Sequence, residues 1–109
     1  MDTFATGSTL AHEAAQEGDA KKLEKIITAD KSQVSLQDEN GWQPLHEGAR
    51  GGHEEVVKLL LKHGADMNAR TNEGVGGTPL WLAEREHGSD HAVVKFLRSI
   101  GAESIGPEL

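Results

Sequence analysis

The stretch Gln43-Pro44-Leu45-His46-Glu47-Gly48-Ala49-Arg50-Gly51-Gly52-His53 decides the fold, because related stretches precede and follow it at a regular spacing. Upstream, His12 and Gly18 stand 34 positions before His46 and Gly52. Downstream, Thr78-Pro79-Leu80-Trp81 begins 35 positions after Gln43. A period of roughly 20–50 residues is typical of architectures built from stacked supersecondary units.

Apolar residues keep this register through the rest of each unit. Val56-Val57-Lys58-Leu59-Leu60 recurs 37 positions later as Val93-Val94-Lys95-Phe96-Leu97. The helical spacing of these residues predicts a second helix in each unit, after a first helix that begins at Pro44 or Pro79. Because the third unit holds two more residues than the second between these points, we expect a longer turn around residues 85–90.

The three units resemble the ankyrin repeat, which has a period of about 33 residues and a Thr-Pro-Leu-His-x-Ala core. The second unit matches this pattern most fully, the third has Trp81 in place of the histidine, and the first lacks the proline. The resemblance implies an all-α fold, an ankyrin-repeat solenoid of three helix-turn-helix repeats joined by β-hairpin loops. We expect one domain over residues 1–109, with repeats at about 8–37, 38–70 and 71–103 and a C-terminal tail at 104–109.

The two ends of the array are predicted to be polar, because an end face meets water instead of another repeat. Glu84 stands where the second unit has Ala49, and Arg98 stands where it has Leu61. Polar residues between positions 16 and 22 play the same part in the first unit. We therefore expect a complete three-repeat unit that carries its own caps.

Composition argues against several classes of function. The formal charge is −7, from 18 acidic and 11 basic residues, and the longest basic run is Lys21-Lys22, so no patch for nucleic-acid phosphates is predicted. Without cysteine there is no disulfide or thiolate metal site. No apolar run reaches the roughly 18 residues of a membrane helix. We expect a soluble monomer in the cytoplasm or the nucleus, with no nucleic acid, membrane or cofactor bound.

No catalytic motif stands out. The chain lacks a Gly-x-Ser-x-Gly turn and a phosphate-binding loop, and Gly74-Val75-Gly76-Gly77 is interpreted as a hairpin tip. An enzyme is therefore not predicted, and no catalytic residue, metal ligand or cofactor is assigned. Two alternatives stay open: a metal-binding or catalytic site at the His87–His91 turn, and a regulatory fragment of a larger protein. The turn residues between the two histidines weigh against the first, because they break the spacing that a helical ligand pair needs.

The family resemblance also implies a binding surface, formed by the hairpin tips and the concave face of the first helices. Matched by position, it comprises Glu39, Asn40, Trp42, Glu47 and Arg50 in the second repeat and Asn72, Glu73, Val75, Leu82, Arg85 and Glu86 in the third. Trp42 is either an exposed anchor or a ring that packs on the adjacent hairpin, whereas Trp81 is predicted to fill the core. The acidic groove with two arginines suggests another protein as partner, with a basic segment and an apolar plug.

Overall fold

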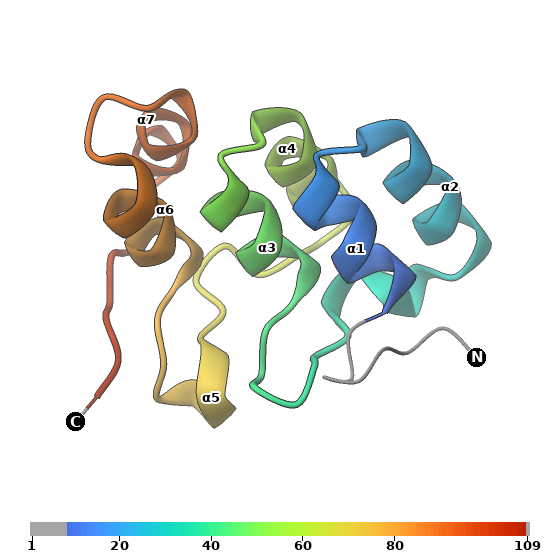
Figure 1. Cartoon of the computed structure of the whole chain (residues 1–109), viewed down its shortest axis with the longest axis horizontal. Helices are drawn as coiled ribbons and strands as arrows, with labels where there is room; N and C mark the ends of the chain where they lie inside the picture. The colour runs from blue at the N-terminus through green and yellow to red at the C-terminus, as the bar shows by residue number, and fades with distance from the viewer. Residues whose placement is uncertain (1–8, 109) are drawn as a thin grey trace.

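The computed structural model describes residues 9–108, in which three helix pairs stand side by side (Figure 1). The first helices of the pairs are α1 (Leu10–Glu17), α3 (Pro44–Gly51) and α6 (Pro79–His87), and the second helices are α2 (Ala20–Ala29), α4 (Glu54–Lys62) and α7 (Ala92–Ser99). Two short elements lie in the connections, the 3-10 helix η1 (Lys31–Ser35) and α5 (Thr71–Gly74). The predicted all-α architecture of three helix-turn-helix repeats is confirmed.

The connections between pairs are hairpin turns. The amide of Asp38 donates to the carbonyl of Trp42 (2.9 Å), and the amide of Thr71 donates to the carbonyl of Gly77 (3.1 Å). We call these segments hairpin 2 (residues 38–42) and hairpin 3 (residues 71–77). Both point toward the bottom of Figure 1. They are too short to build a strand ladder, so the β-hairpin loops expected from the sequence contain no strand within the described residues.

Threonine side chains cap the starts of the first helices in two of the three repeats. Thr9 and Thr78 each accept a hydrogen bond from the backbone amide three residues further on (3.3 and 3.4 Å). These bonds satisfy amides that have no partner inside the helix. At α3, Gln43 makes no such bond, and its buried Oε1 has no hydrogen-bond partner among the described residues. Pro44 still begins this helix, because its fixed φ suits the first helical position.

The core runs without interruption through all three repeats. Its largest fully buried apolar side chains come from the second helices and from one leucine of α3: Leu23, Ile27, Leu45, Val56, Val57, Leu60, Val93, Val94 and Leu97. The first helices contribute small residues that allow close approach. A Cβ at Gly48 would lie only 2.7 Å from Cγ1 of Val56. Because no repeat can bury its apolar face alone, stacking creates this core.

The C-terminal end face is polar, as its sequence predicts. Nη2 of Arg98 lies 2.7 Å from Oε2 of Glu84, and Ser104 donates a hydrogen bond to the same carboxylate. Partial burial alone would raise the pKa of Glu84. The hydrogen bonds from Ser104 and Arg98 and the charge of Arg98 more than offset that effect, so the pKa of Glu84 is lowered. The two residues that distinguish this end from the second repeat therefore pair with each other.

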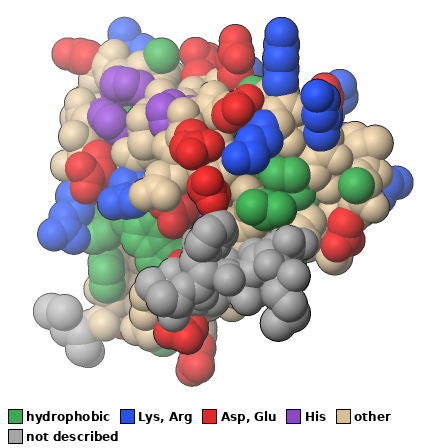
Figure 2. Space-filling view, turned by 45° about the vertical axis from the view of Figure 1, so that its right-hand side comes forward, with side chains coloured by type: hydrophobic (Ala, Val, Ile, Leu, Met, Phe, Trp, Pro, Cys, Tyr) green, Lys and Arg blue, Asp and Glu red, His purple; other side chains and the backbone are tan. Residues whose placement is uncertain are grey.

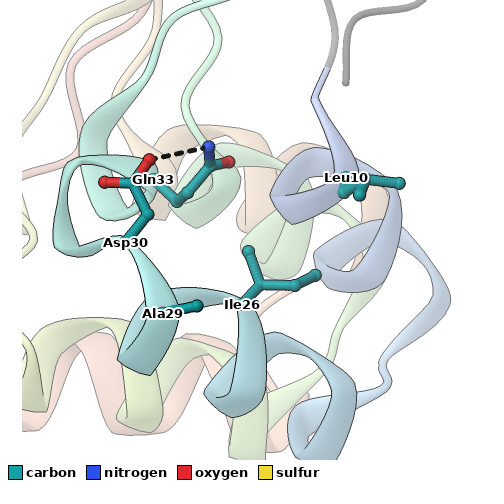
Figure 3. A pocket seen from close by; sticks show the side chains of 5 residues that line it. All are labelled: Leu10, Ile26, Ala29, Asp30 and Gln33. Carbon is teal, nitrogen blue, oxygen red and sulfur yellow. Dashed lines mark hydrogen bonds between the residues drawn. The ribbon is translucent and has the colours of Figure 1, made fainter. Parts of the chain in front are cut away.

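The N-terminal end face is less polar than the sequence suggests. Leu10, Ile26 and Ala29 line an open cavity of about 200 Å³, together with Asp30 and Gln33 (Figure 3). Gln33 donates to the carboxylate of Asp30 at one edge of this cavity (3.4 Å). The apolar side chains come from α1 and α2, and the polar pair comes from the start of the connection that follows.

The C-terminal residues are bound to hairpin 3, although the sequence suggested a tail or tether. The amide of Thr78 donates to the carbonyl of Ile105 (3.0 Å), and the amide of Glu108 donates to the carbonyl of Val75 (2.7 Å). Residues 103–108 therefore run beside hairpin 3, in the place that a further hairpin would take. We call them the C-terminal segment.

Candidate partner-binding surface

Buried imidazoles set the position of each hairpin. Nε2–H of His12 donates to the carbonyl of Trp42 (2.6 Å), and Nε2–H of His46 donates to the carbonyl of Ala69 (2.7 Å). The first bond joins α1 to hairpin 2, and the second joins α3 to the connection that leads into hairpin 3. Nδ1 of both rings accepts from the amide three residues earlier, which places the proton on Nε2. Burial lowers the pKa of His46, and the bond to Ala69 opposes this effect only in part.

A second set of imidazole bonds joins the repeats at the turns between paired helices. Nε2–H of His53 donates to the carbonyl of Gln16 (3.0 Å), and Nε2–H of His87 donates to the carbonyl of Arg50 (2.7 Å). The lengthened turn of the third repeat thus brings His87 to the place that His53 has in the second. Histidine side chains gather at the upper left of the face shown in Figure 2.

The His87–His91 turn holds a stacked pair of rings. Their centroids lie 4.3 Å apart, with an interplanar angle of 28°. Nε2–H of His87 donates to the carbonyl of Arg50, and Nδ1 of His91 accepts from the amide of Val93 (3.1 Å) at the start of α7. Within residues 9–108, no three His, Asp or Glu side chains converge as ligands of one metal ion. The two hydrogen bonds place His87 against the second repeat and His91 at the start of α7.

Trp42 folds back onto its own repeat. Its ring centroid lies 6.0 Å from that of His46, and Cζ of Arg50 lies 5.2 Å from it. The carboxylate of Asp38 fixes the turn by accepting from the amide of Trp42 (2.9 Å). Because Trp42 is half-buried, part of it packs on α3 while the rest is open to solvent. The ring thus packs on its own repeat and is exposed in part, and its role as an anchor stays a prediction.

Two arginines at equivalent positions of the second and third repeats stack on tryptophans. Cζ of Arg85 lies 5.2 Å from the ring centroid of Trp81, the same separation as in the pair of Arg50 and Trp42. Arg50 also pairs with Glu47 (3.2 Å) and has 41% of its side chain exposed. Stacking on a ring orders a guanidinium while leaving donors free.

Trp81 lies against the C-terminal segment, and Leu82 is buried. A Cβ at Gly77 would lie 2.6 Å from Cε3 of Trp81, and one at Gly106 would lie 2.6 Å from Nε1. The half-buried ring is thus held between hairpin 3 and the C-terminal segment. Leu82 is only 8% exposed, so the prediction that it belongs to the accessible binding surface is wrong. Its equivalent in the second repeat, Glu47, is partly buried, with 12% of its side chain exposed, and its carboxylate pairs with the more exposed Arg50.

The other predicted residues of the third repeat and the hairpin tips lie at the surface. Exposed positions are Glu39 and Asn40 on hairpin 2, Asn72, Glu73 and Val75 on hairpin 3, and Arg85 and Glu86 on α6. The amide of Asn72 donates to the carbonyl of Asn40 (2.7 Å), which holds the two tips side by side.

Arg70 belongs to this region, although sequence reasoning missed it. Its Nε donates to the carbonyl of Gly76 (2.8 Å) and its Nη2 donates to the carbonyl of Gly106 (3.1 Å). Nη1 lies 3.7 Å from a carboxylate oxygen of Glu108. Arg70 therefore ties hairpin 3 to the C-terminal segment. Only the lone cation ahead of a glycine-rich stretch could have drawn attention to it.

Three stacked helix pairs with hairpins along one side define a helical-repeat protein whose surface is open. A family model described as ankyrin repeats, in three copies, matches residues 9–105. The chain therefore belongs to the ankyrin-repeat family, as its motifs predict. Ankyrin repeats generally mediate protein–protein interaction. In the described part of the chain, no helix has the length and apolar character needed to cross a membrane.

The curated relatives share the repeats and differ in the rest of their chains. The Delta-latroinsectotoxin-Lt1a of Latrodectus tredecimguttatus is 39% identical over 71 residues, which are 64% of this chain and 6% of the toxin. The mouse 2-5A-dependent ribonuclease is 34% identical over 64% of this chain and 9% of its own length. Mouse protein phosphatase 1 regulatory subunit 27 is 34% identical over 81% of this chain and 54% of its own length. The chain thus spans at most about half of each of these three proteins.

Proposed function

We propose that this chain is a protein-binding module that holds its partner across the tips of hairpins 2 and 3 and the concave face of α1, α3 and α6. The stack of Trp42 and Arg50 supports this most, because tryptophan and arginine are enriched at binding hot spots. The proposed surface comprises Glu39, Asn40, Trp42, Glu47, Arg50, Asn72, Glu73, Val75, Arg85 and Glu86. Leu82 is left out because it is buried.

The stack is ordered before any partner arrives. His12 holds the carbonyl of Trp42, Asp38 holds its amide, and Arg50 lies over its ring. Binding through groups that are already ordered loses less conformational entropy, and this favours affinity. A half-buried indole in such a setting can therefore act as an anchor without a large rearrangement.

A basic partner segment suits the charge of the chain and of the tips. The formal charge is −7, and Glu39 and Glu73 are exposed on neighbouring tips. Acidic side chains are also prominent on the face shown in Figure 2, with lysines and arginines beside them. Opposite charge speeds encounter and selects partners more than it adds affinity. The partner segment would therefore combine Lys or Arg with an apolar side chain that covers the ring of Trp42.

A regulatory role within a larger assembly is the second candidate. The match to mouse protein phosphatase 1 regulatory subunit 27 covers 81% of this chain, more than the matches to the toxin and the ribonuclease. That similarity makes protein phosphatase 1 the first purified protein to test as a partner.

The experiment compares the affinities of the wild-type chain and Trp42→Ala for protein phosphatase 1 and for purified partners found by affinity capture. We expect binding to weaken about tenfold or more, since truncation of a hot-spot residue costs at least that much. Arg50→Ala should act in the same direction. His63→Ala, which changes an exposed residue just after α4, is the control. Equal affinity of wild type and Trp42→Ala for every partner would refute the anchor role.

A further inference from the structure

The tip of hairpin 3 has an unusual backbone. Hairpin 2 closes over five residues, and hairpin 3 closes over seven. The longer loop contains α5, in which Asn72 (φ 50°, ψ 57°) and Glu73 (φ 56°, ψ 33°) are left-handed. A residue with a Cβ is disfavoured in this region, especially glutamate, so the turn is held at a cost in free energy. Backbone strain of this kind is often found at sites of function.

The strained turn is braced on both sides. The amide of Asn72 donates to the carbonyl of Asn40 in hairpin 2 (2.7 Å). Two amides at the end of hairpin 3 donate to the carbonyl and Oγ1 of Thr71 (2.8 and 3.1 Å). On the far side, the amide of Glu108 donates to the carbonyl of Val75 (2.7 Å). Hairpin 2 and the C-terminal segment flank this tip in Figure 1, so the tip is fixed although it is exposed.

The braced turn presents an apolar side chain to solvent. Val75 is 40% exposed, and the only other large hydrophobic residue this exposed among residues 9–108 is Ile100, at 38%. A valine on a mobile loop could turn inward, but the hydrogen bond at its carbonyl fixes its backbone. An apolar group that is held in place loses little entropy when a partner covers it.

We infer that the tip of hairpin 3, residues 72–75, inserts Val75 into a shallow apolar pocket on a folded partner protein, beside a lysine or arginine that meets Glu73. The inference rests on the proposed protein-binding function and specifies the partner's chemistry. A protruding tip fits a concave surface, because a flat or convex surface could contact only the end of the side chain. The two proposed contacts differ in geometry: at hairpin 3 the tip enters a pocket of the partner, whereas at Trp42 a segment of the partner covers the ring.

The charge around Val75 supports the cation in the partner. Glu73 is exposed within the tip, and the side chain of Glu108, on the neighbouring strand of chain, is 62% exposed. Nη1 of Arg70 lies 3.7 Å from a carboxylate oxygen of Glu108, while its Nε and Nη2 donate to backbone carbonyls. Glu73 therefore faces solvent as the acid nearest Val75 in the tip. Opposite charges at the rim of an apolar contact add specificity.

The test uses a naive phage-displayed Fab library selected on the full chain, because unrelated binders find pre-ordered apolar anchors without prior bias. Affinities of independent clones are then measured for Val75→Ser and for the matched control Ile100→Ser. We expect most clones to bind Val75→Ser about tenfold more weakly, from loss of the buried valine side chain, and to bind Ile100→Ser as tightly as wild type. The same clones should bind Glu73→Gln more weakly than wild type, and this difference should shrink at high salt. Thermal melts check folding, and Val75→Ile should restore binding if an apolar group is what matters.

Parallel measurements with Trp42→Ala separate this inference from the proposed function. Clones that depend on Trp42 and tolerate Val75→Ser would overturn the role of the tip and leave the binding surface standing. Clones that tolerate both changes would overturn both. Equal losses for Val75→Ser and Ile100→Ser would also overturn the role of the tip, since exposure alone would then explain them.

Discussion

Replacing His46 by alanine tests what holds the repeats together. The imidazole is fully buried; it accepts from the amide of Gln43 (2.9 Å) and donates to the carbonyl of Ala69 (2.7 Å), just before hairpin 3. Alanine would leave both backbone groups without their partner, at about 1–3 kcal/mol each. Removing the packed ring adds a cavity. We therefore expect His46→Ala to lower the free energy of unfolding by about 3–5 kcal/mol.

Thermal and urea unfolding, followed by circular dichroism, would measure this effect. At about 4–8 °C for each kcal/mol in a domain of this size, the melting temperature should fall by about 12 °C or more. The control is His63→Ala, which changes an exposed histidine and should stay within about 0.5 kcal/mol of wild type. If His46→Ala melts within a few degrees of the control, the imidazole does not join the repeats in the way described above.

Three further predictions concern pH, a cap and an end face. Burial lowers the pKa of His46 below its ordinary 6.5, so as the pH falls this imidazole is protonated in the unfolded chain before it is protonated in the folded one. The contribution of neutral His46 to stability is therefore complete above about pH 6.5 and is lost as the pH falls below it. Urea unfolding should show a free energy of unfolding that falls with pH in this range in wild type, and falls less steeply in His46→Ala. Gln43→Thr should raise the free energy of unfolding by about 1 kcal/mol, since it removes a buried amide oxygen without a partner and provides a better cap; a loss in urea unfolding would contradict this. The double variant of Glu84→Ala and Arg98→Leu should make the C-terminal face apolar, so sedimentation should show self-association that rises with concentration, and a strict monomer would count against the capping argument.

The repeats and the core could be predicted because several patterns agree on one register. Pro44 and Pro79 mark helix starts, Val57 and Val94 mark the buried stripe, and each is repeated at nearly the same spacing. The role of His87 could not be predicted in this way. Its bond to a neighbouring carbonyl depends on how the lengthened turn folds, and spacing alone does not encode that path.

The exposure of the hairpin tips could be predicted, but the burial of each candidate residue could not. The exposed tips follow from the turn residues around Asn40 and Glu73. The burial of Leu82 could not be predicted, because a position in the family pattern does not show which way the side chain turns. The left-handed conformation suits Asn72, but glutamate does not favour it, so the sequence does not indicate it at Glu73, and hydrogen bonds from other segments brace the turn.

The repeats that lie away from the main contact also shape the surface. His12 belongs to the first repeat, yet it donates to the carbonyl of Trp42, the proposed anchor in the second. In the same way, Glu108 near the end of the chain donates to the carbonyl of Val75 on the tip of hairpin 3. Both apolar residues that we propose as partner contacts are therefore positioned through their backbone by a neighbouring segment, and their side chains remain partly exposed. Side chains at the tips can then vary without disturbing the core. Loss of either hydrogen bond would make the backbone at Trp42 or Val75 more mobile and so raise the entropy cost of binding a partner there.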